Sequence, residues 1–374
     1  MSARDITLHG PKAALPDDLA SAWLALRDKA TSSPYFHPAY AEAVARHAPA
    51  PVRVLVSGRD TPRAILPVQG KRVARPAGAP MTDYHGVVGT AEQGLGTFLR
   101  QCGIGVLGVG GWTTGADTPP HGLDPVPACR IDLSEGVGSW EESRDGSYRR
   151  HAKSTRRRTR KATEEVGEPR LVWRSRDIDA FNTLVAWKRA QFATTRKFDV
   201  LGGWPGHLIR DLWERGPDSA LRADLHALYF GDRLAALDLG LAEGGTFHSW
   251  IVAYDPELSA YAPGIQLLEG IVRAAPDLGY RTLDLGVGLD GYKRHYANVE
   301  ARAGVGIFRT QGARAGLSRL YGRLETRADA LARLRRRYTQ ISAVEPGIWG
   351  RTRAMGEAVM GEAVAGNARP PLPA

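Results

Sequence analysis

The sequence has little of several features that would each define a class of protein. Its two cysteines, Cys102 and Cys129, exclude a disulfide scaffold or a cysteine-rich zinc module and favour a reducing cytoplasm. No apolar run reaches the roughly 18 residues of a membrane-spanning helix, and Met1–Leu15 shows no secretory signal. His226, His248 and His295 have no metal-ligand spacing, and no Gly-x-Ser-x-Gly nucleophile elbow is present, so we expect neither a metal nor a serine nucleophile.

What the chain does have is enough length for two or three domains and a net charge of +10 over 374 residues. A basic balance suggests nucleic acid, an anionic membrane or an anionic ligand as partner. The charge is concentrated: residues 149–161 carry +8 and residues 309–374 carry +7, which leaves −5 for the rest. The protein is therefore not uniformly basic.

The central basic segment predicts a helix that begins at an N-cap Ser147 and ends at Gly167. A solvated linker helix and a site for phosphates both fit this composition, since arginine forks suit phosphate oxygens. Nucleic acid is the weaker interpretation. Apart from Tyr148 and His151, no aromatic residues interleave with the arginines for base stacking.

Hydrophobic periodicity predicts alternating helices and strands along the chain. The expected helices are 17–29, 35–47, 95–102, 178–194, 204–214, 264–275, 291–297 and 313–338. The expected strands are 52–56, 64–68, 104–109, 128–133, 171–174, 225–230, 234–242, 247–254, 282–287 and 304–309.

A strand–turn–strand pattern at Val54–Gln69 is echoed at Leu228–Leu241. The echo is compatible with two copies of one α/β unit of the α+β type, each a mixed, mostly antiparallel sheet flanked by helices. We expect an N-terminal unit at 1–140, a basic connector helix at 141–168, a C-terminal unit at 169–312, and an amphipathic C-terminal helix with a flexible tail at 313–374.

Two segments compete as the carrier of chemistry. Leu283–Asp290 looks like the glycine-rich loop of methyltransferases that bind S-adenosylmethionine, but that interpretation needs a doubly wound sheet after the loop, and too little chain follows. Phe247–Asn298 instead predicts strand, loop, helix and strand. The helix beginning near Gly264 offers backbone N–H groups for a pyrophosphate.

Separated motifs give the chain a resemblance to a known family. They are Ser33–Pro38, Pro80–Gly86, the basic helix ending at Glu165–Gly167, Trp187–Gln191 with Phe198–Leu201, Tyr261–Gly264, and Asp284 with Gly291–Lys293. Through them, roughly residues 30–310 resemble the CelD-like (exopolysaccharide-type) branch of GNAT acyltransferases, which is related to the Fem peptidoglycan aminoacyltransferases with tandem GNAT units.

The resemblance implies transfer of an acyl group from acyl-CoA, as co-substrate, to an amine without a covalent enzyme intermediate. Such a reaction needs a proton acceptor, polarisation of the thioester oxygen and alignment of the two substrates. The usual Arg/Gln-x-x-Gly-x-Gly/Ala pyrophosphate loop is reduced here to Gly264. We expect Tyr261, Pro263 and Gly264 to bind the donor, with the basic helix as another source of phosphate contacts.

Asp83 and His85 follow a turn rich in proline and glycine and are the first candidates for amine binding and proton removal, with Asp284 as a further catalytic candidate. Lys188 and Gln191 share a helix face. The expected substrate-binding residues are Tyr84, Lys188, Gln191, Tyr292 and Lys293.

The leading hypothesis is a cytoplasmic N-acyltransferase, possible also at the inner face of the membrane, acting on an amino sugar or a lipid-linked cell-envelope precursor in polysaccharide biosynthesis. A long-chain sphingoid base is a variant acceptor, because basic helices can contact an anionic membrane. Fem-like transfer from aminoacyl-tRNA is the alternative enzyme and the only interpretation that needs nucleic acid. A non-enzymatic scaffold with a degenerate GNAT fold is the third hypothesis.

Overall fold

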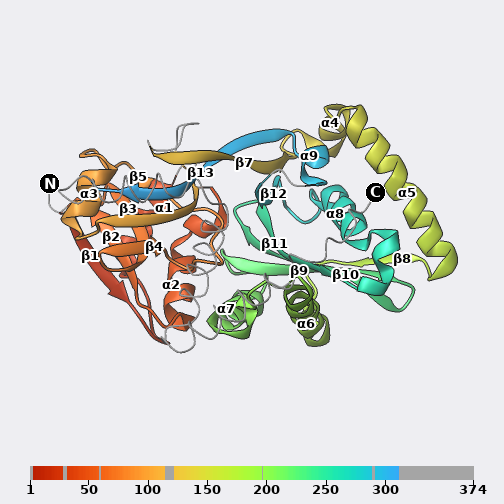
Figure 1. Ribbon diagram of the computed structural model, residues 1–374, viewed down its shortest axis with the longest axis horizontal. Helices are drawn as coiled ribbons and strands as arrows, with labels where there is room; N and C mark the ends of the chain where they lie inside the picture. Colours follow the sequence, from red (N-terminus) through yellow and green to blue (C-terminus); the bar gives the residue numbers. More distant parts are fainter. Residues whose placement is uncertain are drawn as a thin grey trace, which may run out of the picture.

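The computed structural model describes residues 3–27, 32–58, 60–113, 122–195, 197–288 and 291–310. In these residues the strands form one continuous, mostly antiparallel sheet with helices on both faces (Figure 1). The mixed α/β class predicted from the sequence is confirmed. The predicted C-terminal helix at 313–338 and the tail lie outside the described residues.

The N-terminal half contributes one end of the sheet. Its strands are β1 (Ala3–Leu8), β2 (Val52–Ser57), β3 (Ala64–Gly70), β4 (Val73–Pro76), β5 (Val88–Gly89), β6 (Val106–Trp112) and β7 (Leu123–Asp132). Its helices are α1 (Asp17–Leu26), the 3-10 turn η2 (Pro34–Phe36), α2 (Pro38–His47), α3 (Leu95–Gln101) and α4 (Gly136–Glu142).

The C-terminal half begins with α5 (Gly146–Glu165) and contributes the other end. Its strands are β8 (Pro169–Val172), β9 (Arg222–Phe230), β10 (Arg233–Glu243), β11 (Thr246–Tyr254), β12 (Thr282–Val287) and β13 (Val299–Arg309). Its other helices are α6 (Ile178–Thr194), η3 (Val200–Gly202), α7 (Trp204–Glu214), η4 (Pro256–Tyr261), α8 (Pro263–Ala274) and α9 (Lys293–Tyr296). The predicted bounds of α6, α7 and β12 are confirmed to the residue.

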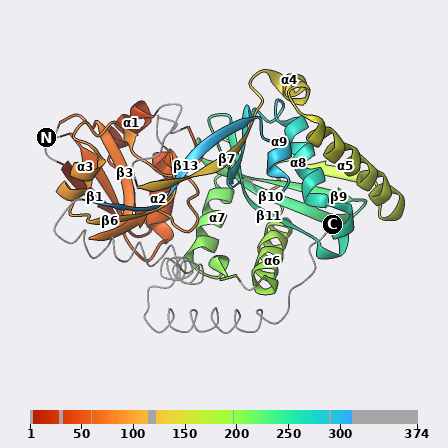
Figure 2. The same ribbon diagram turned by 45° about the horizontal axis from the view of Figure 1, so that its top comes forward.

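Two strands join the halves. Strand β13 pairs with β6 and β7, and β7 pairs in turn with β12, so strands from the two halves alternate at the middle of the sheet (Figure 2). Strand β12 lies inside this sheet, which excludes a doubly wound methyltransferase fold for the glycine-rich segment after it. The division at residues 140, 168 and 312 stays a prediction.

The halves also share a hydrophobic core. Buried residues of α2, such as Val44, belong to the same apolar cluster as Leu212 of α7 and Leu239 of β10. Polar contacts join the same helices at the surface, where His47 Nε2 lies 2.9 Å from Asp211 Oδ2. Burial of one continuous apolar surface fixes the two halves relative to each other.

The N-terminus of α5 differs from its prediction. The N-cap is Asp145, whose carboxylate accepts hydrogen bonds from the backbone N–H groups of Ser147 and Tyr148, each at 2.9 Å. Ser147 is already inside the helix, and its hydroxyl lies 2.8 Å from Nδ1 of His295. An aspartate caps a helix as well as a serine does, so composition alone does not choose between them.

Candidate active site

The candidate site lies where the parallel strands β11 and β12 stop pairing. Their ladder joins Thr246–His248 to Thr282–Asp284, and both strands then continue. A register shift in the neighbouring β10–β11 ladder leaves Trp250 without a partner on β10. Such a bulge leaves backbone groups available for a ligand.

Asp284 is fully buried at this point and is held by several donors. The Tyr84 hydroxyl and the Gly286 N–H donate to Oδ1 at 2.9 and 2.8 Å, and Nε of Arg130 donates to Oδ2 at 2.9 Å. Burial favours the neutral acid, but His248 and Arg130 outweigh burial and lower the pKa of Asp284 to about 2. Asp284 is therefore a carboxylate at neutral pH.

His248 joins Asp284 to Asp83. Its Nδ1 lies 3.3 Å from Asp284 Oδ1, and its Nε2 lies 3.0 Å from Asp83 Oδ2. Burial favours the neutral ring, but the two carboxylates outweigh burial and raise the pKa of His248 to about 9. The side chain of His248 is fully buried, whereas that of Asp83 is 41% exposed. His248 thus lies between the buried carboxylate of Asp284 and the solvent-accessible carboxylate of Asp83.

Asp83, His248 and Asp284 form a triad, and two motifs singled out in the sequence, Ser33–Pro38 and Pro80–Gly86, lie beside it. Tyr35 packs its ring edge-on against His248, with centroids 5.0 Å apart. The Trp250 indole N–H donates to the backbone carbonyl of Met81 at 3.0 Å, which anchors the segment that carries Asp83.

The close approach of the Asp83 carboxylate to the backbone after Asp284 favours a glycine at position 286. A Cβ at Gly286 would lie 3.2 Å from Asp83 Oδ2, and the backbone φ of +80° is one that side chains disfavour. The glycine-rich segment of the sequence therefore serves close packing beside the triad.

His85 and Tyr84 are both buried. His85 Nε2 accepts a hydrogen bond from Gly110 N–H at 3.3 Å, its ring packs edge-on against Trp112, and burial lowers its pKa to about 3. It is therefore neutral at pH 7. Tyr84 has no exposed surface, and its hydroxyl donates to Asp284. The prediction that Tyr84 binds a substrate stays a prediction.

The predicted donor residues lie around the start of α8. Pro263 and Gly264 form its first turn, after Ala262 at φ 53°. Tyr261 turns away to α5, where its hydroxyl donates to Glu165 Oε2 at 2.6 Å. No side chain caps α8, but the Ile265 and Gln266 N–H groups both donate to the Ala262 carbonyl, at 3.1 and 3.2 Å. Donor binding at this helix N-terminus stays a prediction.

The other predicted substrate residues are dispersed. Lys188 Nζ donates to the Val252 carbonyl of β11 at 3.1 Å, beyond the end of the ladder, whereas Gln191 is exposed. After β12, Lys293 Nζ donates to the Val287 carbonyl at 3.4 Å, and burial raises the pKa of Tyr292 to about 12. Lys188 is thus the member of this set that adjoins the β11 backbone near the site.

Sequence reasoning missed His248 and Arg130. Both lie on strands that it predicted, at 247–254 and 128–133, but His248 was considered only as a metal ligand. A charged residue within a largely apolar strand was the available signal for Arg130, because such a residue is rarely buried without a partner.

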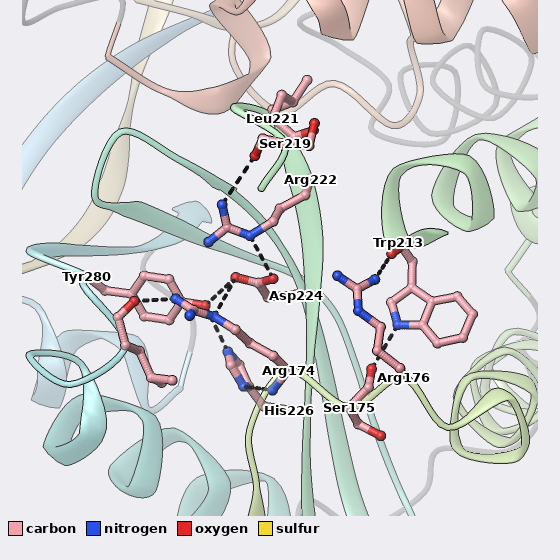
Figure 3. Close-up of polar contacts among 11 residues, drawn as sticks. Arg174, Ser175, Arg176, Trp213, Ser219, Leu221, Arg222, Asp224, His226 and Tyr280 are labelled. Atoms are coloured by element: carbon pink, nitrogen blue, oxygen red, sulfur yellow. Dashed lines mark hydrogen bonds and ion pairs between the residues drawn. The ribbon is translucent and has the colours of Figure 1, made fainter. Parts of the chain in front are cut away.

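A second polar network lies around Asp224, on β9 (Figure 3). The fully buried Asp224 pairs with Arg222 at 3.0 Å and Arg174 at 3.3 Å, and accepts a hydrogen bond from the Tyr280 hydroxyl at 2.6 Å. Burial lowers the pKa of the adjoining His226 to about 4, so that ring is neutral. The network fastens the turn after α8 to the sheet.

Removing one donor from this network should destabilise the fold. Because Tyr280→Phe leaves a buried carboxylate with one hydrogen bond fewer, we expect the free energy of unfolding to fall by about 2 kcal/mol in urea titration. The exposed Tyr254 provides a matched control, and Tyr254→Phe should change it by under about 0.5 kcal/mol. Equal effects of the two substitutions would contradict the assignment.

No described helix is both long and apolar enough to cross a membrane. Within the described ranges, no group of three or more His, Cys, Asp or Glu side chains could hold a metal ion.

The fold and this geometry agree with a comparison against known families. Residues 149–294, from α5 to α9, match the family model described as an acetyltransferase (GNAT) domain. The chain therefore contains a GNAT-type acyltransferase domain, and the triad residues His248 and Asp284 lie within it. No curated protein matches the chain.

Three solved structures are similar to this chain at low identity. The C-terminal DUF2156 domain of an Agrobacterium fabrum protein, described as a lysylphosphatidylglycerol synthetase, is 11% identical over 83% of this chain and 96% of that one, with a TM-score of 0.48. FemX is 10% identical over 72% and 90%, with a TM-score of 0.48. A tandem GNAT protein from the clavulanic acid biosynthesis pathway is 11% identical over 83% and 100%, with a TM-score of 0.42. Similarity at this level does not identify a substrate.

Proposed function

We propose that this protein is an N-acyltransferase that moves an acyl group from acyl-CoA to a primary amine by direct attack. The observation that carries the proposal is the accessible carboxylate of Asp83, held by His248 and Asp284 at the end of the β11–β12 ladder. This end of the ladder lies in the segment that matches the GNAT domain.

Each group would have one part in the reaction. Asp83 receives the ammonium form of the acceptor and takes a proton from it, directly or through water. The free amine then attacks the thioester carbonyl, the C–N bond forms, the C–S bond breaks, and coenzyme A leaves as the thiol. We assign the backbone N–H groups of the bulge at Trp250 to the developing oxyanion, because the register leaves Trp250 without a partner on β10.

We place the donor in the C-terminal half because the corresponding position in the N-terminal half is filled. There, the parallel β4–β6 ladder joins only Val73–Ala74 to Val106–Leu107, and His85 then forms a parallel bridge with Trp112 at the end of β6. His85 N–H donates to the Gly111 carbonyl at 3.0 Å, and Thr113 N–H donates to the His85 carbonyl at 2.9 Å. A Cβ at Gly111 would lie 1.7 Å from the Asp83 carbonyl oxygen, so the contact leaves no room for a ligand.

For the acceptor we propose an amino sugar or a lipid-linked cell-envelope precursor, which is what the resemblance to CelD-like acyltransferases implies. The partly exposed carboxylate of Asp83 suits a cationic amine of any of these classes. A sphingoid base shares that chemistry and is tested in the same assay.

The test is thiol release from a set of CoA thioesters mixed with the protein and a panel of amines: amino sugars, a sphingoid base and amino acids. We expect release to depend on both substrates and to yield an amide by mass spectrometry. A parallel reaction with aminoacyl-tRNA tests the Fem-like alternative. Absence of thiol release from every pair, together with absence of acyl-CoA binding by calorimetry, would refute the proposal and favour a scaffold.

A further inference from the structure

Helix α5 carries a continuous basic face that the reaction does not use. At about 100° per residue, seven of its eight basic side chains fall within an arc of about 140°. They are Arg149, Arg150, Lys153, Arg156, Arg157, Arg160 and Lys161, all exposed. The buried side chains of the helix, such as Ala152 and Ala162, lie on the opposite arc.

Most of this charge forms no ion pair within the part of the chain that the structure describes, although Arg149 and Arg156 line a pocket together with Glu141 and Glu142. Arg160 and Lys161 pair with Glu164 and Glu165 one turn further on, at 3.9 and 3.7 Å. Among the described residues, the remaining five members of the arc have no acidic group within ion-pair distance. An exposed row of unneutralised cations costs self-repulsion and is relieved by an anionic surface.

The position of the helix suits a broad, flat partner. Its twenty residues span about 30 Å, and α5 runs along the outer edge of the C-terminal half (Figures 1 and 2). The basic arc contains no aromatic side chain for base stacking. Tyr148 is buried, and His151 stacks on His295 with ring centroids 4.8 Å apart.

We propose that α5 is an electrostatic docking surface for membranes rich in anionic phospholipid. The flat row of charge favours a lipid surface over single-stranded RNA, whose binding relies on aromatic platforms. With no exposed apolar side chain on the arc, the helix rests on the headgroups and does not insert. This inference does not rest on the proposed acceptor or on catalysis, because binding is measured without turnover.

The test is cosedimentation of the full chain with vesicles of phosphatidylcholine alone or mixed with phosphatidylglycerol. We expect binding only to the mixed vesicles, and loss of binding as salt rises from about 0.1 to 0.5 M. Each basic residue near an anionic surface changes partitioning about fivefold. The quadruple variant Arg149→Gln, Lys153→Gln, Arg156→Gln, Arg157→Gln should therefore bind at least about a hundredfold more weakly.

A matched variant removes the same charge elsewhere. Arg4, Lys12, Lys71 and Arg72 are exposed on the N-terminal half, and their replacement by glutamine should change partitioning by less than about threefold. Equal losses in both variants would show that only net charge matters and overturn the proposal. Unchanged vesicle binding by the α5 variant would also overturn the proposal. So would a native protein that binds tRNA but does not bind anionic vesicles.

Discussion

Replacing Asp83 by asparagine should lower kcat of acyl transfer by about 100-fold or more, the usual contribution of a positioned proton acceptor. The amide keeps the size of the side chain but cannot accept the proton of an ammonium group. Because the Asp83 side chain is 41% exposed, its exchange should leave the fold intact. Steady-state kinetics of thiol release, with circular dichroism as the check on folding, measure this effect.

The kinetic parameters separate the two parts assigned to Asp83. A fall in kcat indicates proton removal, whereas a rise in the KM of the amine alone would indicate that Asp83 only binds the cation. Asp218, an exposed loop carboxylate, supplies the matched control, and Asp218→Asn should leave both parameters unchanged. If Asp83→Asn behaved like this control, the triad would not be the reaction centre.

Local signals in the sequence were sufficient to predict individual helices and strands. They were not sufficient to predict how strands of the two halves pair. The caps and periodicity of residues 178–194 and 204–214 gave helices with the observed bounds. The pairing of β13 with β6 and of β7 with β12 brings together segments that are 150 or more residues apart. Strand patterns carry the alternation of side chains but not the identity of the partner strand.

The candidate site shows the same limit. Asp83 was singled out because loop residues after a turn rich in proline and glycine are often functional, and Asp284 because it lies on a predicted strand. Their connection depends on His248, which lies opposite Asp284 in the β11–β12 ladder. That register is set by the sheet and cannot be read from either strand alone, so the sequence could name both carboxylates without revealing the cation between them. The buried positions of Tyr84 and His85 follow from the same packing.

The His248 ion pair should also make stability depend on pH in a defined window. Its pKa is raised from 6.5 to about 9 in the folded protein, so its stabilising contribution is complete below about pH 6.5 and is lost as pH rises through 9. At about 1.4 kcal/mol for each pKa unit, the free energy of unfolding should fall by about 2–3 kcal/mol between pH 7 and pH 10. The lowered pKa of Asp284 has the opposite sign, and its contribution is lost as pH falls from about 4 through 2.

Urea titrations of the native protein and of His248→Gln across pH 7 to 10 isolate the histidine, because other groups such as the half-buried Cys102 thiol titrate in both proteins. Burial raises the pKa of the neighbouring Asp238 to about 7, so that carboxyl changes stability mainly at lower pH. His248→Gln keeps a polar side chain between Asp83 and Asp284 but removes the titrating charge. We expect its stability to be lower than that of the native protein at pH 7 and the difference to shrink towards pH 10, where the native ring has lost its proton. If the free energies of unfolding of the native protein and of His248→Gln ran parallel from pH 7 to 10, His248 would be neutral already at pH 7. Asp83 would then accept a proton with no positively charged histidine beside it.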